Sequence, residues 1–182
     1  MVHKPPTSRR FGAILADPPW KFQTWSAKGA SRSPKYRLMT AHEIADVRVE
    51  DVALNDCILF LWATWPMLEQ ALFVIDRWGF TYKTCGFSWT KLADGEVQMG
   101  TGYWTRANTE PCLLATRGSP KRIGRDIPQA IVESRREHSR KPDCVYERIE
   151  RLVDGPYLEL WSRTTRPGWT QWGDEVGKYD AA

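Results

Sequence analysis

A short apolar run that ends in an acidic proline turn constrains this chain most. Residues 13–16 read Ala-Ile-Leu-Ala and are followed directly by Asp17, Pro18, Pro19 and Trp20. An apolar run of this length predicts a buried strand with the aspartate at its carboxyl end. Each proline fixes its own φ, and each restricts the residue before it. We therefore expect the chain to leave a central strand through a stiff turn that holds a carboxylate.

The remaining pattern alternates apolar strands with amphipathic helices. We expect further strands at 57–62, 80–91, 111–116 and 157–161, and helices that begin after Thr40, around Leu68 and after Pro142. Thr40 and Glu43 have capping-box spacing, and Gly79 is a plausible helix stop. This alternation predicts an α/β fold with a mostly parallel, doubly wound sheet. Such sheets bind ligands at the carboxyl ends of their strands.

Length and cysteine spacing favour one domain in a reducing compartment. The 182 residues suit a single domain over 1–182, with 1–10 as a flexible tail and 21–37 as a mobile loop. The four cysteines lie more than 25 residues apart without a CxxC pair, so we expect no metal site and a cytoplasmic location. The N-terminus lacks a signal-peptide core, and the longest apolar run, 57–63, is too short to span a membrane.

The acidic turn has a chemical interpretation. The exocyclic N6 amine of adenine is a poor nucleophile, and a carboxylate such as Asp17 can accept its hydrogen bond and stabilise the positive charge that develops on nitrogen. The Pro18 carbonyl, held at a fixed angle by Pro19, can accept the second N–H. Trp20 offers a flat face for a base that leaves its stack. The alternative is a strand end followed by an ordinary proline turn.

Several motifs together resemble the MT-A70 family of adenine-N6 methyltransferases, over about Phe11 to Glu175. The motifs are Ile14–Trp20, Leu59–Trp62, Trp78–Phe80, Trp89–Lys91, Gly102–Trp104, Glu110, Glu137–Asp143, Glu159–Arg163 and Gly168–Trp169. The resemblance implies a Rossmann-like fold that uses S-adenosyl-L-methionine as cofactor, with a permuted motif order. The catalytic loop comes early and the cofactor strand, 157–161, comes late. An N-terminal GxGxxG is accordingly absent.

The resemblance also implies roles for individual residues. Asp17 would hold the target amine near the cofactor, and Lys141 would pair with the methionine carboxylate or a substrate phosphate. The other implied cofactor contacts are Glu159, Arg163, Thr165, Arg166, Asp174 and Glu175. The implied substrate contacts are Tyr36, Trp89 and Glu110, with His138 in a structural or positioning role. The implied contact with the cofactor adenine upstream of Asp17 has no counterpart that we can assign.

The segment from Arg117 to Lys141 is the most basic part of the chain. It holds eight basic and three acidic residues, a local net charge of +5, whereas the whole chain carries +4. One interpretation is a flap beside the active site in which Arg122 and Arg125 contact phosphates. The alternative is a solvated loop.

The main functional hypothesis is a site-specific adenine-N6 methyltransferase that acts on DNA, and the runner-up is the same reaction on RNA. A catalytically dead nucleic-acid-binding subunit is the alternative from another class, although the intact Asp17 argues against it. A dehydrogenase would require a glycine-rich first turn, which the chain lacks. The recognition sequence, the strand preference and the choice between monomer, homodimer and heterodimer stay open.

Overall fold

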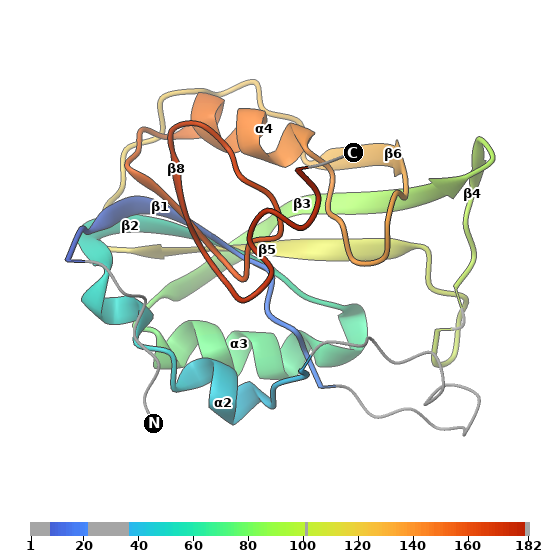
Figure 1. Ribbon diagram of the computed structural model, residues 1–182, viewed down its shortest axis with the longest axis horizontal. Helices are drawn as coiled ribbons and strands as arrows, with labels where there is room; N and C mark the ends of the chain where they lie inside the picture. The colour runs from blue at the N-terminus through green and yellow to red at the C-terminus, as the bar shows by residue number, and fades with distance from the viewer. Residues whose placement is uncertain (1–7, 22–36, 101, 181–182) are drawn as a thin grey trace.

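The computed structural model describes residues 8–21, 37–100 and 102–180. One mixed sheet forms the middle layer (Figure 1). Helices α2 (Ala41–Ala45) and α3 (Leu68–Arg77) cover one face, and α4 (Cys144–Leu152) covers the other. The described part of the chain contains no helix long and apolar enough to cross a membrane.

The sheet has eight strands in the described residues. They are β1 (Phe11–Ala16), β2 (Ala53–Trp62), β3 (Thr81–Ala93), β4 (Glu96–Val97), β5 (Thr109–Arg117), β6 (Ala130–Ser134), β7 (Tyr157–Leu160) and β8 (Trp169–Trp172). Two short 3-10 turns, η1 (Val49–Asp51) and η2 (Trp65–Met67), precede β2 and α3. The strands and helices expected from the apolar pattern are all present, whereas β4, β6 and β8 were not predicted.

The strand order is β4-β3-β5-β2-β1-β7-β8, with β6 paired to β3. The prediction of a mostly parallel sheet holds for only one half. Strands β2, β1, β7 and β8 are parallel, but β5 runs antiparallel to both β2 and β3, and β4 is antiparallel to β3. The physical reason is the connection from β3 to β5, which has no crossover helix and therefore returns the chain antiparallel to β3. Strand β6 pairs parallel with β3.

Side chains alternate between the two faces of the central strands. In β1, Ile14 belongs to the core under α2 and α3, while Leu15 belongs to the core under α4. In β2, Leu59 likewise belongs to the core under α2 and α3, and Phe60 belongs to the core under α4. A strand with helices on both faces must be apolar at every position, which explains the unbroken apolar runs in the sequence.

The topology brings several strand ends to one edge of the sheet. Asp17 follows β1 directly, and its amide donates to the Leu160 carbonyl at the end of β7. Because β5 runs antiparallel, its beginning at Glu110 lies at this edge, opposite Trp89 near the end of β3. Polar residues from both halves of the sheet therefore meet there.

The cap of α2 provides a test of the local structure. The Thr40 hydroxyl accepts from the Glu43 amide at 3.2 Å, and the Glu43 carboxylate accepts from the Thr40 amide at 2.8 Å, as the capping box predicted. We expect Thr40→Ala to lower the free energy of unfolding by about 1 kcal/mol, because the cap is lost. Thr40→Ser retains the hydroxyl and should lose much less. Equal stability of both variants in urea titrations would contradict the role of the cap.

Candidate active site

A cavity of about 540 Å³ opens at the edge where these strand ends meet. This volume lies in the range of small-molecule and cofactor sites. Its walls come from segments far apart in the sequence and include Asp17, Trp20, Trp89, Lys91, Glu110, His138, Lys141 and Arg163. A smaller hollow adjoins it, lined by Asp17, Tyr146, Glu159, Trp161, Arg163 and Thr164, among others.

Asp17 lies between two cations. Its Oδ1 is 2.8 Å from Lys141 Nζ, and its Oδ2 is 3.1 Å from Arg163 Nη1. Only 14% of the Asp17 side chain is exposed. Buried carboxylates require such partners, because an unpaired charge in a dry environment is costly. The carboxylate is therefore held in a fixed orientation at the floor of the cavity.

Lys141 joins Asp17 to a second carboxylate. Its Nζ is 3.1 Å from Glu110 Oε1, and Lys91 pairs with the other oxygen of Glu110. Burial acts to raise the pKa of Glu110, but the positive charges of Lys141 and Lys91 outweigh burial and bring the pKa to about 2. Burial opposes the charged form of Lys141, yet Asp17 and Glu110 raise its pKa above the ordinary value. Glu110 and Lys141 are therefore both charged at neutral pH.

Arg163 extends the charged network on the other side of Asp17. Its Nε donates to Glu175 Oε2 at 2.9 Å, and its Nη1 also reaches the Ser139 carbonyl at 3.4 Å. Glu175 in turn pairs with Lys178 at 2.6 Å. Arg163 thereby connects the segment after β8 to Asp17 at this edge of the sheet.

Glu159 is the buried acid of β7. The Tyr146 hydroxyl donates to its carboxylate at 2.9 Å, and the Ser162 hydroxyl donates at 2.7 Å. Burial raises the pKa of Glu159 to about 7, although both hydroxyls favour the charged form. Neighbouring Asp17 adds to the rise.

Burial and several hydrogen bonds fix the turn that follows Asp17. Trp20 is 6% exposed, and its indole N–H donates to the Trp62 carbonyl at 2.9 Å. The Pro18 carbonyl accepts from the Trp20 amide at 2.9 Å, and the Pro19 carbonyl accepts from Met39 at 2.8 Å. Trp20 lines the cavity, but most of its ring is packed within the protein.

The expected substrate residues have different surroundings. Trp89 lines the cavity, and its indole N–H donates to the Glu133 carbonyl at 3.0 Å. His138 is exposed at the rim, with Nδ1 2.8 Å from the Ser139 hydroxyl. Tyr36 lies outside the described residues.

Of the expected cofactor residues, Asp17, Lys141 and Arg163 line this cavity, Glu159 lines the adjoining hollow, and Glu175 lines neither but pairs with Arg163. The other three lie elsewhere. Thr165 bonds Asp180 through its amide and hydroxyl. Arg166 forms a bidentate pair with Glu150 of α4 at 2.8 and 2.9 Å. Asp174 lines a separate hollow of about 320 Å³ that adjoins Pro19.

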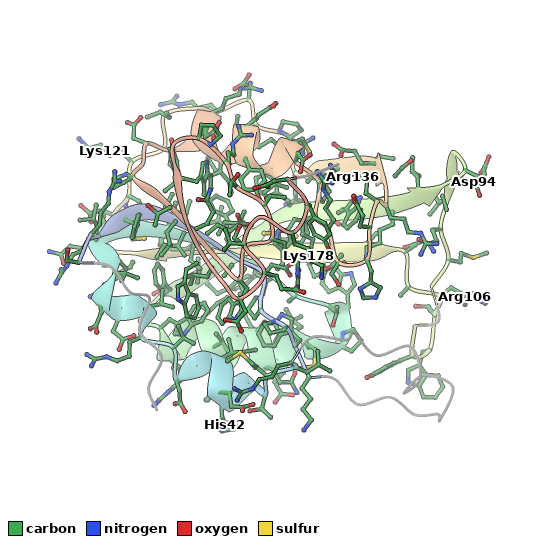
Figure 2. All side chains as sticks on the ribbon, in the orientation of Figure 1. His42, Asp94, Arg106, Lys121, Arg136 and Lys178 are labelled. Carbon is green, nitrogen blue, oxygen red and sulfur yellow. The ribbon has the colours of Figure 1, made fainter. Side chains whose placement is uncertain are left out.

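The basic segment is divided by β6. The amide of Ile123, beside Arg122, donates to the Leu152 carbonyl at the end of α4, whereas Lys141 precedes the beginning of α4. Figure 2 shows Lys121 near the left edge of the molecule and Arg136 well away from it, to the right of the centre. The structure therefore does not place Arg122 and Arg125 in a flap beside the cavity; only residues 135–141 line it. A role of these two arginines in binding nucleic acid elsewhere stays a prediction.

Sequence reasoning missed the partners that hold the site residues. Lys91 was noted only as part of a motif, and Tyr146, Ser162 and Thr164 were not singled out. The buried Glu159 was a usable signal, because a carboxylate in an apolar strand demands donors. The sequence does not say which donors they are.

Comparisons with known proteins agree on one family. The model of the MT-A70 family matches residues 11–175. The Type II methyltransferase M.MunI of Mycoplasma sp is 29% identical over 92% of this chain and 78% of its own length. The putative N(6)-adenosine-methyltransferase MT-A70-like of Medicago truncatula is 31% identical over 92% of this chain and 26% of its own length. The N(6)-adenosine-methyltransferase catalytic subunit METTL3 of Homo sapiens is 28% identical over 92% of this chain. The chain spans 28% of METTL3, so it covers about a quarter of the two adenosine methyltransferases.

The raised pKa of Glu159 predicts a pH dependence of stability. The native carboxyl holds its proton up to about pH 7, whereas the unfolded group ionises near 4.5. Its stabilisation is thus complete below pH 4.5 and is lost as the pH rises through 7, by about 3 kcal/mol. We expect Glu159→Gln to gain stability relative to the wild type over this interval in urea titrations. The exposed Glu147→Gln should follow the wild-type profile; parallel profiles for Glu159→Gln would contradict the prediction.

Proposed function

Because the chain belongs to the MT-A70 family, we propose that it methylates the N6 amine of adenine in nucleic acid. One observation carries the proposal: a buried carboxylate, Asp17, held at a strand end between Lys141 and Arg163 on the floor of a cavity. The names of the relatives support the reaction, since several are called N(6)-adenosine-methyltransferases.

Asp17 has the acceptor capacity that this reaction needs. A carboxylate has about four lone-pair positions, and the two cations occupy one on each oxygen. A remaining position can accept an N–H of the target amine. As the amine attacks, positive charge develops on nitrogen, and the adjacent negative charge stabilises it. The two cations hold the carboxylate in one orientation, so little reorganisation accompanies the reaction.

The Pro18 carbonyl can supply the second acceptor. It already accepts from the Trp20 amide, but a carbonyl oxygen has a second lone pair. The target base must leave its stack to reach this turn, at a cost of a few kcal/mol. Because Trp20 is largely buried, it offers the base only the part of its ring that lines the cavity. The proton of the amine can leave after methyl transfer, so no strong base is needed and His138 serves in positioning.

The charged groups fit S-adenosyl-L-methionine as the cofactor. This zwitterion carries a carboxylate, an ammonium group and a sulfonium, and when bound it supplies the electrophilic methyl group. Lys141 and Arg163 suit its carboxylate, and Asp17 and Glu159 suit its positive groups. Arg163 also pairs with Glu175, the residue that the family resemblance assigns to the ribose hydroxyls. The adjoining hollow beside Glu159 and Thr164 provides room on the same side.

We propose DNA as the preferred substrate, with RNA as the alternative. The support is the extent of the similarity: it covers 78% of the Type II methyltransferase M.MunI but only about a quarter of the adenosine methyltransferases. An assay with matched DNA and RNA oligonucleotides, followed by identification of the methylated nucleoside, separates the two.

Removal of the Asp17 carboxylate tests the proposed chemistry. We expect Asp17→Ala and Asp17→Asn each to lower methyl transfer at least about 100-fold, because the negative charge beside the amine is lost. The readout is transfer of a labelled methyl group to oligonucleotides. Lys141 still has Glu110 and Arg163 still has Glu175 as a partner, so both variants should fold. Near-normal turnover in folded variants would exclude the role of Asp17.

We expect calorimetry to show binding of S-adenosyl-L-methionine and its demethylated product, but not of NAD.

Two arginines provide a matched test of cofactor binding. Arg163→Ala should weaken cofactor binding about 10- to 100-fold, since a charged hydrogen bond is removed and Asp17 loses a partner. Arg166→Ala removes the contact with Glu150 and should leave the affinity nearly unchanged. An equal loss of cofactor affinity in both variants would contradict this prediction and would indicate that Arg166 also contacts the cofactor.

A further inference from the structure

Two aromatic residues form an exposed tip between β4 and β5. The Trp104 side chain has a relative exposure of 101%, and Tyr103 has 53%. The part of the chain that carries β4 projects beyond the rest of the sheet (Figure 1). A fully exposed indole has a hydrophobic cost in water, so it calls for an explanation.

The tip stands on a braced base. The Gly100 amide donates to the Ala107 carbonyl at 2.5 Å, and Arg106 Nε donates to the Gly100 carbonyl at 2.7 Å. Arg106 Nη2 also reaches the Met99 carbonyl at 3.3 Å. Gly102 has a φ of +58°, and a Cβ there would lie 1.8 Å from the Thr105 carbonyl oxygen. Hydrogen bonds and the glycine thus define the conformation in which the aromatic rings are presented.

This braced segment is also a wall of the catalytic cavity. Gln98, Gly100, Gly102, Ala107 and Asn108 all line the cavity that holds Asp17. Tyr103 and Trp104 do not line the cavity themselves, but they directly follow Gly102 of this wall, so the aromatic tip adjoins the cavity mouth. A ligand that extends out of the cavity past Gly102 would reach them.

The basic residues that line the cavity near the aromatic tip indicate which kind of ligand could bind there. Arg135, Arg136 and Arg140 line the same cavity from the segment after β6. Single-stranded nucleic acids bind where basic side chains accompany exposed aromatic rings on which bases can stack. The combination at this mouth fits a polyanion with flat, stackable bases.

We propose that Trp104, assisted by Tyr103, stacks on an unpaired base that flanks the target nucleotide. The proposal rests on the proposed function in taking nucleic acid as the substrate. The target base enters the cavity, and the flanking base packs against the indole outside it. Stacking places the strand relative to Asp17 without reading the identity of the flanking base.

The experiment measures binding of fluorescein-labelled single-stranded oligonucleotides by anisotropy over a range of salt concentrations. We expect Trp104→Ala to weaken binding about 5- to 100-fold, the range for loss of one stacked base, and Trp104→Phe to retain most of the affinity. The dependence on salt should keep its slope, because no phosphate contact is removed. The matched control is Tyr82→Ala, an exposed aromatic at the beginning of β3, which should bind like the wild type.

A second readout locates the contact. With 2-aminopurine beside the target adenine, stacking on Trp104 should quench fluorescence in the wild-type complex, and Trp104→Ala should relieve the quenching. Unchanged affinity and unchanged quenching in Trp104→Ala would overturn the proposal. A change in oligomeric state on ultracentrifugation with oligonucleotide binding intact would overturn it as well, and would assign the tip to a protein contact.

The two proposals fail separately. Loss of oligonucleotide binding in Trp104→Ala supports the stacking role even if the wild type transfers no methyl group. Methyl transfer by the wild type together with an unaffected Trp104→Ala variant rejects the stacking role and leaves the proposed function standing. Cofactor affinity, measured by calorimetry, should be the same in the wild type and in Trp104→Ala.

Discussion

The candidate site depends on the two ion pairs of Lys141, whose ammonium group lies between two carboxylates from different halves of the sheet. Asp17 follows a strand of the parallel half, and Glu110 begins a strand of the antiparallel half. Without this cation, two negative charges would face each other in a largely dry cavity. Lys141 offsets their repulsion, because its ammonium group pairs with both carboxylates. The orientation of Asp17 therefore depends on a residue 124 positions away in the sequence.

The same network explains how a cluster of charges can be buried at all. Each ion pair costs desolvation energy, which is repaid only when the geometry is good and the remaining polar atoms are bonded. Charges alternate in sign along the row Lys91, Glu110, Lys141, Asp17, Arg163 and Glu175. Such a row contributes less to stability than to orientation, because it fixes where each carboxylate oxygen points. Glu159 lies beside the row and is held by hydroxyl groups instead, which leaves its carboxyl with a pKa near 7.

The sequence predicted what local chemistry determines. Apolar runs marked β1, β2 and β7, and the proline turn marked Asp17 as the key carboxylate. Three strands escaped prediction for physical reasons: β4 has two residues, β6 is mostly exposed, and β8 has no apolar alternation. The direction of each strand could not be predicted either, because an apolar run has the same pattern whether the strand pairs parallel or antiparallel. The missed β6 had a consequence for the site, since it separates Arg122 and Arg125 from the basic residues that reach the cavity.

The mixed direction of the sheet is consistent with the two ligands that we propose for one cavity. A purely parallel sheet presents only the carboxyl ends of its strands at the ligand edge. Here the antiparallel return adds the beginning of β5 and the segment that precedes it to the same edge. The parallel half contributes Glu159 and Arg163, the groups we propose for the cofactor. The antiparallel half contributes Trp89, Lys91 and the wall that carries Trp104, the groups on the proposed substrate side. Asp17 follows β1 in the parallel half and is linked to Glu110 of the antiparallel half through Lys141, so it contacts groups from both halves.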